Sequence, residues 1–267
     1  MGFTSQLRPG EIVIDDGPLP LGAFPPPGFS TGLDLSLKGA FNYSASADPF
    51  PSELLIPRSE WEDRIKEMEE QKTRLSDLMD QAGLPCKDQG QTNYCWINAP
   101  THCVEMVRVI QNQPLVILSP ASVGGPMTNF QNVGGWGGPG LAYIGSKGLV
   151  PVTRWPANAI DRSYWTEDNK VTALFYRQTE WWELEPRNLD QLVSCLLRRI
   201  PVAGGYNWWS HDVTNYDAVL MDGTVAIRTR NSWSMDWPSA GAKGYSILQG
   251  SRMLPDDAVA PRVAIAA

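Results

Sequence analysis

Apolar residues recur with helical spacing through much of the chain and with strand spacing in its last third. The helical period predicts helices over residues 59–81, 97–110 and 188–200. Short apolar runs bounded by turn residues predict strands around Val202, Val219 and Ile227 and over residues 245–248. Helices that precede strands along the chain are typical of an α+β fold.

The helix predicted over residues 59–81 has signals at both ends. Ser59 is placed as an N-cap with Glu62 three residues on, which is the spacing of a capping box, and Gly83 marks the end. An apolar stripe opposes a charged face, and it consists of Trp61, Ile65, Met68, Leu75, Leu78 and Met79. The pattern predicts one continuous amphipathic helix that packs its stripe against the rest of the protein.

Residues 1–57 have a composition that does not predict a domain of their own. Ile12 to Ile14 favour a short strand, and the prolines that follow favour extended or polyproline backbone. The segment still carries more large apolar residues than a disordered tail would, among them Leu19, Leu21, Phe24, Phe29, Leu33 and Leu35. Two hypotheses remain open: an arm that lies in a groove of its own domain, a sister subunit or a larger assembly, or a partly ordered linker.

Other segments have weaker patterns. Residues 116–140 are expected to be mostly loop, residues 149–155 extended, and residues 171–176 a strand. The tail from Pro255, which has two acidic residues and an Ala/Val run, is expected to be a surface or docking segment.

Composition narrows the classes of function. The chain has 267 residues, 42% hydrophobic and 19% charged, and a net charge of −7, which argues against a nucleic-acid partner. No apolar run is long enough to span a membrane, and no signal peptide is visible at the N-terminus, so a cytoplasmic or virion-associated location is expected. Four cysteines without a Cys-x-x-Cys pair give no reason to expect zinc, and no cofactor is expected.

The candidate nucleophile is Cys95. The turn-rich run from Lys87 to Trp96 leads into the helix that follows, so Cys95 is expected at or near a helix N-terminus. Backbone N–H groups and the helix dipole favour an anion there, which predicts a lowered thiol pKa and a reactive thiolate.

A base for this thiol must be one of two histidines. His102 lies seven residues along the same helix, about 10 Å from Cys95 at 1.5 Å rise per residue, so it is expected to be an ordinary packed or helix-surface residue. His211 begins a predicted strand, and a second strand after a turn ends in Asn231. A hairpin of these strands brings the His211 and Asn231 side chains together.

At this point the chain resembles the papain-like cysteine peptidases. The resemblance covers roughly residues 84–250 and rests on Gln89-Gly90, Cys95-Trp96, His211 and Asn231-Ser232-Trp233 in the family's order, with Gly134-Gly135 at the family's substrate-binding glycines. It implies a papain-like α+β fold with a helical half, an antiparallel β-barrel-like half and an active-site cleft between them.

The resemblance also implies residue roles. Cys95 is the expected nucleophile, His211 the acid and base, and Asn231 the residue that orients the imidazole. Gln89 is the expected oxyanion-hole donor, and Trp233 is expected to shield the contact between Asn231 and His211 from water. Gly134 and Gly135 are expected to hold the backbone of a polypeptide substrate, and Trp233 is expected to be a substrate-binding residue as well.

Departures from the family pattern limit what carries over. Thr92 and Asn132 occupy the positions of a disulfide found in secreted members, so that bridge is absent. The segment before His211 is short, and Ser234 stands where the family has a glycine. The substrate specificity of family members therefore cannot be assigned to this chain.

The sequence thus predicts four parts: a proline-rich arm (1–57), an amphipathic helix (58–82), a papain-like catalytic domain (83–254) and a C-terminal tail (255–267). The helix is expected to be a permanent packing element, and the alternative is that residues 1–82 form a removable propeptide. The favoured function is a cysteine peptidase. The alternatives are a cell-wall amidase or transglutaminase-like acyl transferase with the same residues, and a structural component of a phage particle or other assembly that the arm would join.

Overall fold

The computed structural model of the protein describes residues 2–37 and 47–266. Within them, eight strands form one curved sheet in the order β1-β9-β8-β7-β6-β10-β5-β2, and two short strands, β3 and β4, pair separately. The strands are β1 (Ile12–Ile14), β2 (Asp48–Pro49), β3 (Leu118–Ser119), β4 (Val150–Pro151), β5 (Gln178–Glu183), β6 (Val202–Tyr206), β7 (His211–Met221), β8 (Thr224–Arg230), β9 (Tyr245–Leu248) and β10 (Asp257–Ala264).

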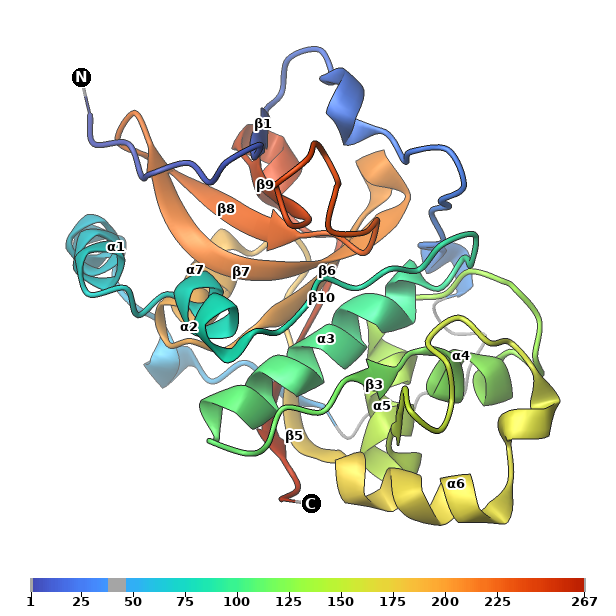
Figure 1. Ribbon diagram of the computed structural model, residues 1–267. Helices are drawn as coiled ribbons and strands as arrows, with labels where there is room; N and C mark the ends of the chain where they lie inside the picture. The colour runs from blue at the N-terminus through green and yellow to red at the C-terminus, as the bar shows by residue number, and fades with distance from the viewer. Residues whose placement is uncertain (1, 38–46, 267) are drawn as a thin grey trace.

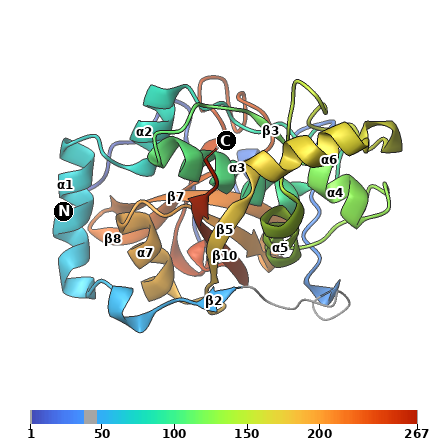
Figure 2. The ribbon, with the colours of Figure 1, turned by 90° about the horizontal axis from the view of Figure 1, so that it is seen from below.

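The helices divide between the two halves of the molecule. In Figure 1, α3, α4, α5 and α6 gather on one side of the sheet, whereas Figure 2 shows α1 and α7 at the opposite end, beside β7 and β8. Their bounds are α1 (Trp61–Glu70), α2 (Leu75–Ala82), α3 (Cys95–Ile110), α4 (Ala121–Met127), α5 (Gly137–Lys147), α6 (Glu167–Ala173) and α7 (Leu189–Leu197). The predicted α+β organisation, with a helical half and an antiparallel-dominated sheet half, is confirmed.

Helix α3 is the element on which the two halves meet. Met106 belongs to the larger core, which includes Trp61, Leu192, Val213 and Tyr216 of the sheet half. Ile97 and Val104 belong to the smaller core of the helical half, with Leu118 and Leu141. Helix α3 is therefore buried on both sides, and its buried residues include polar ones such as His102 and Glu105, which bond to each other.

The single helix predicted over residues 59–81 is divided into two. A 3₁₀ turn over Arg58–Glu60 precedes α1. The helical conformation is interrupted at Lys72, whose φ is +53°, and a second helix, α2, begins at Leu75. Ser59 is therefore not the N-cap, but Gly83 ends α2 with φ +72° as predicted. Leu75 and Met79 of α2 belong to the main core together with Trp61 and Ile65 of α1.

Three other predictions were wrong. Residues 171–176 are not a strand, because Thr166 caps α6 through a 3.2 Å hydrogen bond from the Asn169 N–H and the helix continues as a 3₁₀ turn. The loop expected at 116–140 contains α4 and the start of α5, and only Val150–Pro151 of the segment 149–155 is a strand.

The C-terminal segment is also not a surface tail. β10 lies inside the large sheet, between β6 and β5, and Val259 and Ala260 are fully buried. The alternating Ala/Val run is thus the pattern of a buried strand. None of the helices in the described part of the chain is both long and apolar enough to cross a lipid bilayer.

The N-terminal segment packs against its own chain. β1 pairs in parallel with β9, as the Ile12–Ile14 pattern predicted for a strand, and the chain then runs past the sheet toward the N-terminal end of α3 (Figure 1). The sequence left three locations open for the N-terminal arm. Its described residues pack against their own domain, which is the first of these.

Candidate active site

The loop before α3 brings Cys95 to the first residue of that helix, as predicted. Gly90 adopts φ +50°, a left-handed conformation that suits glycine, and the Thr92 hydroxyl donates a 2.7 Å hydrogen bond to the Gln89 carbonyl. The Gln89 N–H donates to the Ser232 carbonyl at 2.9 Å, which ties this loop to the end of β8. The Cys95 side chain is completely buried.

The predicted hairpin brings His211 and Asn231 together. β7 and β8 pair antiparallel, with Met221 opposite Thr224 at the turn, and His211 and Asn231 lie at the open end. The distance from His211 Nε2 to Asn231 Oδ1 is 2.8 Å. The His211 ring stacks on Trp233, with ring centroids 4.3 Å apart and planes at 22°, and Trp209 meets it edge-on. Trp233, Trp209 and Asn231 together therefore fix the orientation of the His211 ring.

The side-chain amide of Gln89 donates hydrogen bonds to two main-chain carbonyl oxygens. Its Nε2 donates to the main-chain oxygen of Ser30 at 2.9 Å and to that of Thr92 at 2.8 Å. Its Oε1 accepts a 2.5 Å hydrogen bond from the Ser232 hydroxyl, which fixes the orientation of the amide. The expected oxyanion-hole donor is therefore buried, oriented and already bound to a carbonyl group of the same chain.

Gly134 and Gly135 lie on the wall of the cleft formed by the helical half. A pocket of about 380 Å³ adjoins them, lined by apolar residues such as Trp96, Met127, Val133 and Trp136, and by Asp34 of the N-terminal segment. A Cβ added to Gly135 would meet the Trp96 indole at 2.7 Å, and one added to Gly134 would meet the Gly32 oxygen at 2.4 Å. Glycine at both positions allows another backbone to approach the wall closely.

The backbone that approaches these groups belongs to the N-terminal segment. The Gly135 N–H donates to the Gly32 oxygen and the Asp34 N–H donates to the Gly135 oxygen, both at 2.9 Å, so that Leu33 and Gly135 form a parallel bridge. The Gly32 and Leu33 N–H groups donate to the Ser210 oxygen on the opposite wall at 3.2 and 3.1 Å. Trp233 Nε1 also donates to the Ser30 oxygen, at 3.0 Å.

Sequence reasoning did not single out Ser30, Gly32 or Ser210. The sequence around Gly32 gives no clear signal, because another glycine lies four residues before it and its neighbours include Ser30 and Asp34. A Cβ on Gly32 would lie only 2.0 Å from the Asn93 oxygen.

The electrostatics of this closed cleft favour uncharged groups. Burial raises the pKa of the Cys95 thiol well above its ordinary value, and the Asp212 carboxyl raises it further, whereas hydrogen bonds from the Asp212, Trp96 and Gly32 backbone lower it. Burial lowers the pKa of His211 to about 4, against the hydrogen bond to Asn231. The predicted lowered thiol pKa is therefore wrong for this conformation, because the loss of solvation outweighs the helix dipole.

His102 is a packed residue, as expected. Its Nε2 lies 2.5 Å from the Tyr216 hydroxyl and its Nδ1 lies 3.2 Å from Glu105 Oε2, and Glu105 also pairs with Lys87. Burial lowers the pKa of His102 to about 4. The network joins α3 to β7 and fixes the two halves of the site relative to each other.

Asn132 supports the loop that leads into Cys95, at one of the two positions that the sequence comparison assigned to an absent disulfide. Its Oδ1 accepts a 2.6 Å hydrogen bond from the Asn93 N–H, and its Nδ2 donates to the Gln91 oxygen at 3.1 Å. All four cysteines are free. Hydrogen bonds from one amide side chain therefore hold the loop that a covalent bridge holds elsewhere.

Comparison with solved structures gives matches of one fold. Xylellain, a cysteine protease from Xylella fastidiosa, matches with a TM-score of 0.63 and 17% identity over 88% of this chain and 96% of its own. Procathepsin B S9 from Trypanosoma congolense matches with a TM-score of 0.62 and 14% identity over 89% of this chain and 87% of its own.

A third match is the digestive procathepsin L 3 of Tenebrio molitor larval midgut, with a TM-score of 0.56 and 18% identity over 67% of this chain and 66% of its own. No protein-family model matches the sequence, and no curated protein matches it. The papain-like fold that the sequence motifs implied is thus confirmed by structure.

Proposed function

We propose that this protein is a cysteine peptidase that hydrolyses peptide bonds in polypeptide substrates through a Cys95 acyl-enzyme. The sulfur of Cys95 attacks the scissile carbonyl carbon, and His211 transfers a proton to the leaving amine as the C–N bond breaks. A water molecule, deprotonated by His211, then attacks the thioester and releases the acid product and the free thiol. Asn231 keeps the imidazole in place through Nε2, which leaves Nδ1 for the proton that moves.

The observation that carries the proposal is the setting of His211. Its ring lies between a 2.8 Å hydrogen bond to Asn231 and a stack on Trp233, and Asp212, the next residue, contacts the Cys95 sulfur through its backbone N–H. Within the described residues His211 Nδ1 has no hydrogen-bond partner, so this nitrogen is available for proton transfer. A histidine oriented by an amide, whose neighbour in the chain contacts a cysteine at a helix N-terminus, suits acyl transfer by a thiol.

Gln89 supports the same proposal. An oxyanion hole requires a fixed N–H donor at hydrogen-bond distance from a substrate carbonyl oxygen. Gln89 Nε2 makes this contact at 2.9 Å with the Ser30 oxygen, a main-chain carbonyl of the kind that a peptide substrate presents.

The same residues would also serve a cell-wall amidase or a transglutaminase-like acyl transferase, so the products must decide between them. The hypothesis of a structural component rested on the long apolar arm, on the missing secretion signal and on the lack of disulfides, and exposed apolar side chains of the arm, such as Leu21 and Phe24, stay available to a partner. In the described residues that arm packs against its own chain, with Ile14 and Ala23 fully buried.

The test is hydrolysis of a fluorogenic peptide library, with products identified by mass spectrometry, by the wild type and by Cys95→Ala. Cys103→Ala is the matched control, because Cys103 is equally buried in the same helix and has no proposed role. We expect new peptide termini from the wild type and Cys103→Ala and none from Cys95→Ala. Parallel incubations contain peptidoglycan or an added primary amine, and release of muropeptides without cleavage of the library, or acyl transfer to the amine in preference to water, would favour the alternatives.

A further inference from the structure

The backbone of residues 28–34, here called the strap, crosses the candidate cleft between its two walls. On the helical side it bonds to Gly135 through Gly32 and Asp34, and on the sheet side its N–H groups reach the Ser210 carbonyl. Its Ser30 oxygen accepts hydrogen bonds from both Gln89 and Trp233. The strap thus uses the groups that the proposed mechanism needs for substrate.

The fit of the strap depends on Gly32 and Leu33. A Cβ on Gly32 would overlap the Asn93 carbonyl, so no other residue allows the backbone this depth beside Cys95. The Leu33 side chain lies over Gly205 of β6, where a Cβ would come within 2.8 Å of it. The strap is therefore shaped to the cleft and is more than a loop that passes over it.

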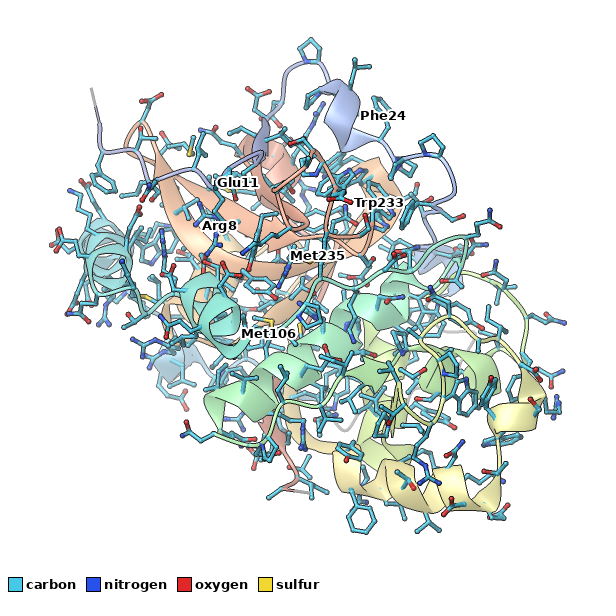
Figure 3. The ribbon with its side chains drawn as sticks, in the orientation of Figure 1. Arg8, Glu11, Phe24, Met106, Trp233 and Met235 are labelled. Carbon is cyan, nitrogen blue, oxygen red and sulfur yellow. The ribbon has the colours of Figure 1, made fainter. Side chains whose placement is uncertain are left out.

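The chain before the strap is built into the sheet half. β1 extends the sheet beside β9, and Ser5 exchanges hydrogen bonds with the backbone of Leu220 in β7. Glu11 makes two hydrogen bonds to the Arg228 guanidinium, at 2.7 and 3.0 Å, and both side chains are fully buried. Figure 3 labels Glu11 and Arg8 beside the sheet, away from the strap.

The chain after the strap is equally built in. β2 pairs with β5, the Ile56 N–H donates to the Ser194 hydroxyl at 2.9 Å, and Trp61 and Ile65 of α1 belong to the main core. Removal of residues 1–82 would therefore uncover the core and leave the Arg228 cation without Glu11. The strap is held by native structure on both sides.

We propose that the strap is a permanent, built-in competitor of substrate, which leaves the cleft by displacement while the full chain stays intact. The proposal rests on the proposed peptidase function of the cleft. Because both flanks are anchored, the displaced strap stays at high local concentration and returns when substrate leaves. A competitor of this kind raises the KM for peptides and leaves kcat unchanged.

The burial of the reacting groups agrees with this geometry. With the strap in place, Cys95 and His211 are both fully buried, and burial favours the neutral thiol and the neutral imidazole. Departure of the strap would admit water and allow the ionised pair to form.

The experiment is alkylation of the folded full-length protein with limiting iodoacetamide at neutral pH, with each of the four cysteines followed by peptide mapping. Gly32→Ala is the opening variant, and Leu21→Ala is its matched control on the same segment, because the Leu21 side chain is 93% exposed. Leu33→Ser is a second opening variant. Cys86, Cys103 and Cys195 report on folding, because general unfolding would expose all of them.

We expect Cys95 alone to react at least about tenfold faster in Gly32→Ala and Leu33→Ser, which corresponds to about 1.4 kcal/mol in the opening equilibrium. Leu21→Ala should match the wild type. In peptide assays, the opening variants should show a lower KM at an unchanged kcat, and intact mass should show the full chain in the active fraction.

Equal Cys95 reactivity in the wild type and both opening variants would overturn the strap proposal, as would activity that arises only after residues 1–82 are lost. Cleavage between Ser30 and Thr31 would show instead that the strap is a substrate. Faster alkylation of Cys95 without any peptide hydrolysis would support the strap and refute the peptidase. Rapid peptide hydrolysis by the wild type, with no increase in hydrolysis by the opening variants, would support the peptidase and refute the strap proposal.

Discussion

The imidazole of His211 stacks on the indole of Trp233, with ring centroids 4.3 Å apart and planes inclined by 22°. The ring is fully buried, and burial brings its pKa to about 4. Since the stack and the Asn231 contact fix its orientation, the charge on this ring depends mainly on access of water. Any change that opens the cleft should therefore move its titration.

The first prediction concerns acid stability. His211 and His102 both have folded pKa values of about 4, below the 6.5 expected in the unfolded chain. The unfolded chain binds the extra protons between these values, so the free energy of unfolding is highest above pH 6.5 and falls as pH drops toward 4. Each ring contributes up to about 3 kcal/mol of this loss. Urea unfolding at pH 7, 6, 5 and 4 measures it.

A His102→Gln variant isolates one ring. The variant should be less stable than the wild type at pH 7, because it loses the contacts of His102 to Tyr216 and Glu105. Its free energy of unfolding should nevertheless change less steeply with pH between 6.5 and 4. The same slope in both proteins would show that other groups cause the acid response.

The second prediction concerns Asn231. Asn231→Ala removes the 2.8 Å contact to His211 Nε2, and the peptidase rate should fall about 100-fold because the base is no longer oriented. Measured kcat and KM should show the loss mainly in kcat.

Asn188→Ala is a suitable control for Asn231→Ala. Asn188 caps α7 through a 3.0 Å hydrogen bond from the Gln191 N–H, so its loss should cost about 1 kcal/mol of stability without touching the site. If both variants lost activity equally, loss of stability would explain the effect and the role of Asn231 would be refuted.

The sequence predicted the parts of the site that local pattern determines. Turn residues before an apolar run placed Cys95 at the start of α3, and a strand–turn–strand pattern brought His211 to Asn231. The catalytic roles given to these residues remain predictions, although their positions were foreseen.

What the sequence did not predict depends on distant contacts. The break near Lys72 and the burial of the C-terminal strand are decided by core packing between segments far apart in the chain. The position of the strap in the cleft depends on an isolated parallel bridge between Leu33 and Gly135, which the spacing of apolar residues does not encode. The predicted direction of the Cys95 pKa shift was wrong for a related reason, because the burial that raises this pKa depends on contacts between distant segments.

The third prediction concerns Asn132. Asn132→Ala removes hydrogen bonds to Asn93 and Gln91, and it should lower the free energy of unfolding by about 1–2 kcal/mol. The loop that ends at Cys95 should also exchange its amide hydrogens faster. Asn158→Ala, which removes a single bond to Asp88 on the exposed side of the same loop, should have a smaller effect on both measurements.

The fourth prediction tests whether the N-terminal segment belongs to the folded core. Glu11→Gln leaves the buried Arg228 guanidinium with Asp217, at 3.4 Å, as its remaining carboxylate in the described structure. Breaking a buried ion pair in this way typically costs about 3–5 kcal/mol, so the urea midpoint should fall steeply. Glu60→Gln removes an exposed pair with Arg64 and should change the unfolding free energy by about 0.5 kcal/mol or less.

A double variant separates the ion pair from other effects at position 11. In Glu11→Met with Arg228→Met, neither member of this ion pair is left as a buried charge without the other, although the 3.4 Å contact from Arg228 to Asp217 is lost besides. The double variant should therefore be more stable than either single variant. A double variant whose loss equals the sum of two large single losses would mean that packing rather than charge pairing holds the segment. A Glu11→Gln variant as stable as the wild type would mean that the segment is only loosely attached, and the anchor before the strap would then fail.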